Sequence, residues 1–128
     1  MLESGDATNV IDEAWEAVEQ KTALPEDFES FRAPRGPAPL QFDTRRAYRR
    51  FFLRNKAILQ HKEMSLAIYT KDISRNGIGI LTPIQLLPKE RVRLRLPNGG
   101  EYQLEVARCR RLSPACYECG TRFVLADA

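Results

Sequence analysis

Two short stretches of this chain carry the side chains best suited to bind a ligand. The first, Arg45–Arg50, is an arginine-rich run. The planar fork of arginine donates two hydrogen bonds to a phosphate, and it also stacks on a purine or pairs with the edge of a guanine. The second, Asp72–Gly77, is a polar turn with an acid, a hydroxyl and a glycine. A carboxylate and a hydroxyl complement a hydrogen-bonding base, so together the stretches predict a site for an anionic nucleotide.

The spacing within the first stretch places two arginines on one side of the chain. Arg46 and Arg50 are four residues apart, as are Arg45 and Arg49, and Arg54 continues the row from Arg50. Residues at this spacing lie on the same side of an extended segment, about 13 Å apart, and are stacked neighbours in a helix.

Either stretch by itself also has an ordinary explanation. A run of arginines is typical of a solvated basic segment or of a patch that binds nucleic acid without specificity. Residues 72–77 are also typical of a plain turn closed by side chain to backbone hydrogen bonds. The occurrence of both in one small domain, in this order, favours the ligand site.

Charge is distributed unevenly along the 128 residues, which suffice for one domain with a proper core. Residues 1–43 carry 10 acidic and 3 basic side chains, whereas residues 44–128 carry 7 acidic and 17 basic ones. The net charge of +3 therefore conceals an acidic arm on a basic body. A basic body favours anionic ligands, and the arm is expected either to shield that surface or to keep the chain soluble.

Metal, redox and catalytic chemistry have weaker support. Cys116 and Cys119 have the CxxC spacing of zinc and redox sites, but residues three apart in a strand point to opposite faces. A structural zinc needs four ligands, and Cys109 and His61 are the only other soft ones, so small buried cysteines are the preferred interpretation. His61 has no evident partner, and no nucleophile elbow, P-loop or paired carboxylates occur. We expect no enzyme, no metal and no cofactor.

The hydropathy of the sequence does not indicate export or membrane insertion. The N-terminus lacks the basic start and apolar core of a signal peptide, and no run approaches the roughly 18 apolar residues of a membrane span. The three cysteines are an odd number without a secretory pattern. A reducing cytoplasm is therefore the expected location.

Residues 41–128 have the pattern of a mainly β domain. In residues 91–96, valine and leucines alternate with Arg91, Arg93 and Arg95, which is typical of a strand with one buried face. An Asn-Gly step at residues 98–99 then predicts a hairpin turn. Six short strands are expected, at residues 56–61, 65–71, 79–82, 91–96, 102–106 and 117–125. Their number and close spacing predict an antiparallel barrel or sandwich.

Residues 1–40 are expected to form an acidic helix followed by a proline-rich linker. Apolar side chains recur at helical spacing at Ile11, Ala14, Trp15 and Val18. This spacing predicts an amphipathic helix over residues 9–20. One short helix cannot stand alone in water, so its Trp15 face is expected to dock, on its own domain in preference to a partner or a second subunit. Four prolines make residues 24–40 a predicted linker without helix, tacked to the surface by Phe28 and Phe31.

With both stretches placed, the chain resembles the PilZ domain family of cyclic di-GMP receptors. The family pattern is an arginine, three residues and an arginine before the barrel, followed downstream by Asp/Asn-x-Ser-x-x-Gly. Residues 46–50 and 72–77 match both halves without a substitution. Residues 78–80 and 117–123 also look like the family, so the resemblance covers roughly residues 42–125. It implies a six-stranded antiparallel PilZ-like β-barrel, to which this chain adds an N-terminal amphipathic helix.

The resemblance also implies roles for the motif residues. Arg46 and Arg50 would grip phosphate and guanine groups. Asp72 and Ser74 would hydrogen-bond one guanine, and Gly77 would let the backbone close on the ligand. The full candidate site is Arg45, Arg46, Arg49, Arg50, Asp72, Ser74, Arg75, Asn76 and Gly77. A long basic residue at position 45 is similar to members that bind a stacked pair of ligands, although Arg45 and Arg49 offer a second register of the same spacing.

We therefore expect a cyclic di-GMP-binding effector. Ligand binding would neutralise the arginine-rich loop, fold it against the barrel and move the N-terminal segment. The output would be a changed contact with an unidentified partner protein in motility, biofilm or exopolysaccharide control, as the family implies. Two alternatives stay open: a PilZ-like adaptor that binds a protein without nucleotide, and a small nucleic-acid-binding barrel. Aromatic residues for a stacking platform are sparse on the predicted outward faces, so nucleic acid is the least favoured partner.

Overall fold

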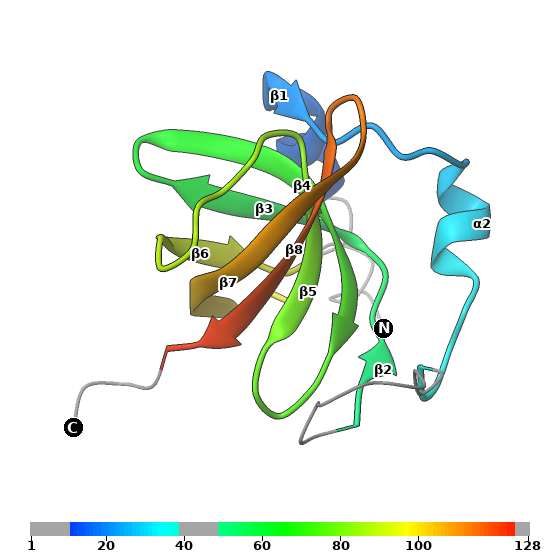
Figure 1. Cartoon of the computed structure of the whole chain (residues 1–128). Coiled ribbons are helices and arrows are strands. Elements are labelled where there is room, and N and C mark those ends of the chain that lie inside the picture. The colour runs from blue at the N-terminus through cyan, green and yellow to red at the C-terminus, as the bar shows by residue number, and fades with distance from the viewer. Residues whose placement is uncertain (1–10, 39–48, 125–128) are drawn as a thin grey trace.

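A computed structural model describes residues 11–38 and 49–124 of the chain. Its centre is a closed, antiparallel, six-stranded barrel (Figure 1). The barrel strands are β3 (Lys56–His61), β4 (Met64–Ile73), β5 (Ile78–Thr82), β6 (Arg91–Arg95), β7 (Glu101–Ser113) and β8 (Cys116–Phe123). Each overlaps one of the predicted strands, so the predicted mainly β fold is confirmed.

The barrel closes because β4 pairs with two barrel strands. Residues 64–69 of β4 lie opposite β3, and residues 69–73 lie opposite β5. The remaining pairs are β3 with β6, β6 with β7, β7 with β8 and β8 with β5, which completes the circle. The predicted alternation in β6 is confirmed, since Val92 and Leu94 are buried and the arginines between them are exposed.

Apolar side chains from all six barrel strands fill the interior. The fully buried members with the largest side chains include Leu59, Leu66, Ile68, Ile80, Leu94 and Leu104. Burial of apolar area from strands far apart in sequence is the main driving force for this closed arrangement. Polar side chains are consequently left on the outer face, where a ligand can reach them.

The N-terminal arm, residues 11–38, packs on the outside of this barrel (Figure 1). Residues 11–17 are helical, which confirms the predicted amphipathic helix over these residues. The helix ends earlier than predicted, because residues 18–20 are not helical and Gln20 belongs to a strand. After the helix, β1 (Gln20–Lys21) adds to β4 in parallel. The hydroxyl of Thr22 donates to the carbonyls of Ala67 and Leu81 at 3.1 and 2.9 Å. The Trp15 helix therefore docks on its own domain.

An aromatic cluster around Tyr69 holds the arm in place. The rings of Trp15, Phe28 and Phe31 lie 5.2–5.6 Å from the Tyr69 ring, centroid to centroid. Trp15 is 5% exposed, and its Nε1–H donates to the carbonyl of Ile68 at 2.8 Å. Phe28 and Phe31 thus attach the segment to the barrel, as predicted.

The segment that was predicted to be a linker without helix contains one. Residues Phe28–Arg32 form α2 between Pro25 and Pro34. The carboxylate of Asp27 caps its first turn by accepting from the N–H and the hydroxyl of Ser30 at 3.1 and 2.8 Å. Prolines prevent a helix only in its interior, so the two that flank α2 limit its length without excluding it.

A short strand, β2 (Phe51–Phe52), joins the arm to the barrel. It pairs with the end of β4, with Phe52 opposite Asp72 and Phe51 opposite Ile73. On its other side, Phe51 forms an isolated bridge with Pro37 of the arm.

Across the described part of the chain, none of the helices has the length and apolar character needed to cross a bilayer.

Candidate ligand-binding site

The two predicted stretches meet at one ion pair. Arg50 directly precedes β2, and the pairing of β2 with β4 brings its guanidinium onto Asp72. Nε donates to Oδ1 of Asp72 at 2.8 Å, and Nη2 lies 2.7 Å from the same oxygen. The side chains are only 15% and 9% exposed. Charge-assisted hydrogen bonds with little access to water hold the Arg50 guanidinium in one orientation.

The turn between β4 and β5 places the hydroxyl of the second motif beside this pair. The N–H of Ser74 donates to the carbonyl of Gly77 at 2.9 Å, which closes the turn. The hydroxyl oxygen of Ser74 accepts from the N–H of Asn76 at 3.1 Å and from Nη1 of Arg50 at 3.4 Å. Ser74 therefore connects the turn to the guanidinium.

Gly77 has a packing role that the sequence did not reveal. It is buried, and a Cβ at this position would overlap the carbonyl oxygen of Thr121 in β8. The neighbouring Asn76 is tied to the same strand, since its carbonyl accepts from the N–H of Phe123 at 2.9 Å. The glycine is thus required by the close approach of β8, and its contact with a ligand stays a prediction.

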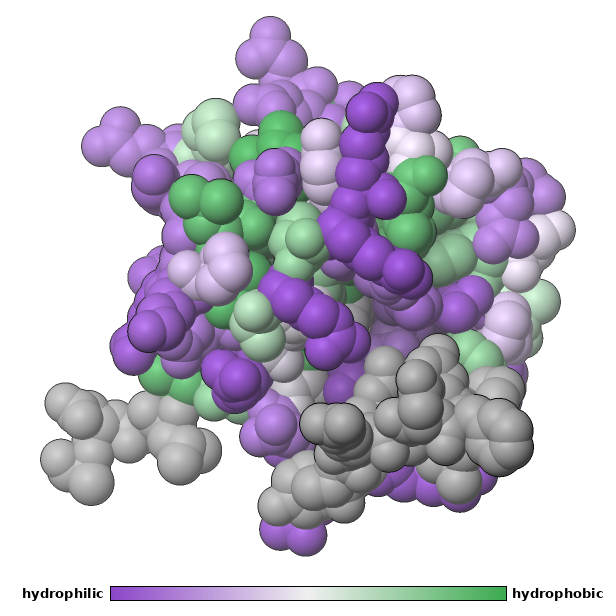
Figure 2. Space-filling view, in the orientation of Figure 1, coloured by the Kyte–Doolittle hydropathy of each residue, from purple (hydrophilic) through white to green (hydrophobic). Residues whose placement is uncertain are grey.

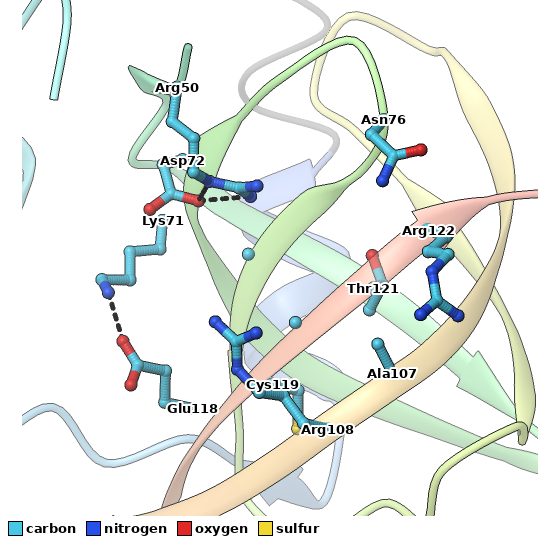
Figure 3. A pocket seen from close by; sticks show the side chains of 12 residues that line it. Arg50, Lys71, Asp72, Asn76, Ala107, Arg108, Glu118, Cys119, Thr121 and Arg122 are labelled. Atoms are coloured by element: carbon cyan, nitrogen blue, oxygen red, sulfur yellow. Dashed lines mark hydrogen bonds and ion pairs between the residues drawn. The ribbon is translucent and has the colours of Figure 1, made fainter. Parts of the chain in front are cut away.

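A pocket of about 200 Å³ opens beside the ion pair (Figure 3). Arg50 and Asp72 stand on one side of it, and Arg108 of β7 and Arg122 of β8 stand on the other. Asn76 also lines the pocket. On this face of the molecule, hydrophilic side chains gather over β7 and β8 (Figure 2).

The floor between the two sides is made by glycine. Gly79 of β5 lies directly opposite Gly120 of β8. A Cβ at Gly79 would lie 3.7 Å from Nη2 of Arg50, and a Cβ at Gly120 would lie 3.6 Å from the guanidinium carbon of Arg108. The Asp72 carboxylate and the Arg50 guanidinium therefore lie over Gly79, and the Arg108 side chain lies over Gly120. The two glycines make room for these charged groups close to the strands.

A second ion network closes another edge of the pocket. Glu118 accepts from Nζ of Lys71 through Oε2 and from Nε of Arg110 through Oε1, the latter at 2.9 Å. Burial raises the pKa of Glu118, but Lys71 and Arg110 outweigh that effect, so its pKa is lower than that of an ordinary glutamate. Glu118 is consequently a carboxylate anion whose charge is already paired with Lys71 and Arg110.

The structure brings four of the predicted site residues together and leaves two other described ones outside the pocket. Arg50, Asp72 and Ser74 are in contact, and Asn76 lines the same pocket. Arg49 and Arg75 are exposed and do not line it. Arg45 and Arg46 lie outside the described residues. Their roles therefore stay predictions.

Arg54 does not continue the row of ligand-facing arginines. Its guanidinium lies between the rings of Phe31 and Phe52, 4.8 and 4.7 Å from their centroids. Nη1 also donates to the carbonyl of Phe31 at 3.2 Å. Arg54 instead fixes α2 to β2, because cation–π contacts on both faces stabilise it there.

Four charged residues of the pocket were missed by the sequence analysis: Lys71, Arg108, Glu118 and Arg122. Lys71 precedes Asp72 directly, so its proximity to the second motif was a usable signal. Arg108 and Arg122 come from strands far along the chain. Only the pairing of β7, β8 and β5 brings them beside Asp72.

The structure also shows the surroundings of the residues that were considered for catalysis, redox chemistry and metal binding. His61, which has no evident partner in the sequence, does have one: its Nε2 lies 3.0 Å from Oε2 of Glu90. Cys116 and Cys119 lie in separate apolar clusters on opposite faces of β8, as predicted. Burial and the neighbouring Cys109 raise the pKa of the Cys119 thiol, so it is a poor nucleophile. Within residues 11–38 and 49–124, no three metal-ligating side chains gather around one point.

A family model described as PilZ domain matches residues 44–128. No curated protein matches the sequence. Among solved structures, the Bacillus subtilis inhibitor of motility (MotI/DgrA) is similar, with 19% sequence identity and a TM-score of 0.49. The alignment covers 70% of this chain and 49% of that one, so the chain spans about half the length of the solved structure.

Proposed function

The chain belongs to the PilZ domain family, and from this premise we propose that it is a receptor for cyclic di-GMP. PilZ domains are receptor and adaptor domains rather than enzymes. In this proposal the ligand occupies the pocket beside Arg50 and Asp72. No cofactor takes part, and the ligand itself is the signal.

The contact between Arg50 and Asp72 is the observation that carries the proposal. The two residues are 22 positions apart, yet the arginine of one motif and the acid of the other share hydrogen bonds, and Ser74 joins them. A guanidinium suits a phosphate or the O6 and N7 acceptors of guanine. A carboxylate and a hydroxyl suit the N–H donors of the same base. The three side chains together are therefore complementary to a guanine nucleotide.

The described residues on either side of Arg45 and Arg46 are hydrogen-bonded to each other next to this site. The N–H of Ala38 donates to the carbonyl of Arg50 at 2.9 Å, and the N–H of Phe52 donates to the carbonyl of Gly36 at 2.8 Å. Arg46 precedes Arg50 by four residues, which places its Cα at most about 14 Å away. We therefore propose that Arg46 binds the same ligand as Arg50. The similarity to family members with a long basic residue at position 45 is the reason for proposing that Arg45 binds a second, stacked ligand molecule.

The same anchoring suggests how a signal would leave the site. Residues 36–38 belong to the arm that covers the outer face of the barrel, and they pair with residues 50–52. Ligand binding would draw residues 45–50 against the barrel and pull on the arm through these hydrogen bonds. A changed contact between the arm and a partner protein is the proposed output.

Calorimetric titration of the full chain with cyclic di-GMP tests this function. GTP and the linear guanine dinucleotide are the matched control ligands. Saturable binding of the cyclic ligand alone, lost in Arg46→Ala, is expected. A stoichiometry near two supports the role of Arg45, and a value near one contradicts it.

The absence of heat, confirmed by equilibrium dialysis, would overturn the proposal. The barrel would then be an adaptor that has kept the motifs, and pull-downs with the chain would be insensitive to added nucleotide.

A further inference from the structure

Two β-bulges place charged side chains at the ends of the glycine floor. In β4, the register shifts between Thr70 and Asp72, which puts Asp72 opposite Gly79. In β7, it shifts between Val106 and Arg108, which puts Arg108 opposite Gly120. Bulges are commonly used to re-aim a side chain next to a functional site.

With Gly79 opposite Gly120, these pairings produce one continuous row across four strands. The row runs Asp72, Gly79, Gly120, Arg108, from β4 through β5 and β8 to β7. The two middle positions are bare, and the two outer ones carry opposite charges. Glycine inside a strand often marks a place where a ligand approaches the backbone closely.

The charges around the pocket do not balance. Asp72 is neutralised by Arg50, and Glu118 is neutralised by Lys71 and Arg110. Of the described residues, none forms a hydrogen bond or ion pair with the guanidinium of Arg108, and the same holds for Arg122. Both arginines lie on the β7–β8 side. The one acidic residue that lines this side, Glu118, is already paired, so this side of the pocket presents an excess of positive charge (Figure 3).

We propose that Arg108 forms a second anion subsite, across the floor of Gly79 and Gly120 from Arg50, which binds a phosphodiester of the ligand. This inference rests on the proposed function and extends it beyond both motifs. The ligand has two phosphates, and Arg50 is held by Asp72 at one end of the row. Arg108 takes the phosphate at the other end. Because Gly120 has no side chain, the Arg108 guanidinium can lie close to the strands on the pocket side. Nothing in the linear sequence near Arg108 marks it for this role.

The test compares Arg108→Ala with Arg93→Ala by calorimetry with cyclic di-GMP. Arg93 is also exposed and lies on β6, outside this pocket, so its loss removes the same charge elsewhere. A charge-assisted hydrogen bond to phosphate predicts a loss of affinity of about tenfold or more for Arg108→Ala. Arg93→Ala is expected to leave the affinity unchanged. Arg108→Lys is expected to recover part of it, because the charge remains.

Two further readouts separate a ligand contact from a structural effect. The affinity of Arg108→Ala is expected to fall less steeply with salt than that of the unaltered chain, since one charge contact is lost. Gly120→Ala meets only ordinary contacts in the structure, so it is expected to fold normally. It is expected to bind more weakly, because its methyl group would lie beneath the Arg108 side chain.

The outcomes distinguish the two proposals. If the unaltered chain binds no cyclic di-GMP, both the proposed function and the proposed subsite are overturned. If it binds and Arg108→Ala binds equally well, the receptor function stands and the subsite is overturned.

Discussion

Gly77 packs against the carbonyl of Thr121 with no room for a side chain between them. Gly77 ends the turn that holds Ser74, and Thr121 belongs to β8, which supplies one side of the pocket. The glycine of the second motif thus joins the turn to the opposite strand. It fixes the distance between the two sides of the site, so its loss would affect ligand binding even without touching a ligand.

Gly77→Ala is therefore expected to destabilise the fold. The added methyl group meets backbone atoms, which cannot move aside as a flexible side chain would, and a cost of about 3 kcal/mol or more follows. The measurement is urea unfolding followed by circular dichroism. Gly120→Ala is the matched control, since its nearest contact would be 3.6 Å away. Equal midpoints for the two variants would contradict the packing role.

Arg50→Ala is expected to weaken both stability and binding. Asp72 is 9% exposed, and removal of its partner leaves a carboxylate with little access to water. The expected cost is about 1–3 kcal/mol in free energy of unfolding. Asp72→Asn in the same background removes the stranded charge, so the double variant should recover stability but not affinity for cyclic di-GMP. Recovery of both would show that Arg50 acts only through the fold.

The barrel was predictable because its strands carry local signals. In β6, Val92 and Leu94 alternate with arginines, and the turn after it contains an Asn-Gly step with Gly99 at a φ of 90°. Burial of one face of a strand leaves this period-two pattern in any sequence. The docking of Trp15 was predictable for a similar reason, since an apolar helix face has to be covered.

The second side of the pocket was not predictable, because it depends on register. Arg108 lies beside Gly120 only because of a shift after Val106, and no residue type marks that shift in advance. A slip of one position would turn each side chain to the other face of the strand. Arg54 illustrates the same limit: its spacing from Arg50 suggested a ligand contact, whereas its direction is set by two rings from α2 and β2.

Trp15→Ala is expected to release the arm from the barrel. The change removes a buried indole and its hydrogen bond to Ile68, which lowers the free energy of unfolding by about 3–5 kcal/mol. Limited proteolysis should then cut residues 11–38 rapidly while the barrel stays resistant. Glu13→Ala, on the exposed side of the same helix, is the control. An arm that stays protected in Trp15→Ala would show that β1 and α2 suffice to hold it.

Glu118→Gln is expected to make stability less dependent on pH. The carboxyl has a lowered pKa in the fold, because Lys71 and Arg110 outweigh the effect of burial, whereas its ordinary value is 4.5. The stabilisation from its charge is therefore fully present above the unfolded pKa. It is lost as the pH falls through the lower, folded pKa. Urea unfolding at several pH values should show the variant to be less stable than the unaltered chain at pH 7, with the gap closing in acid. Glu63→Gln, on an exposed turn, is the control and should be as stable as the unaltered chain at every pH. If the difference in stability for Glu118→Gln persists in acid, the carboxylate charge is not what holds β4, β7 and β8 together at this edge of the pocket.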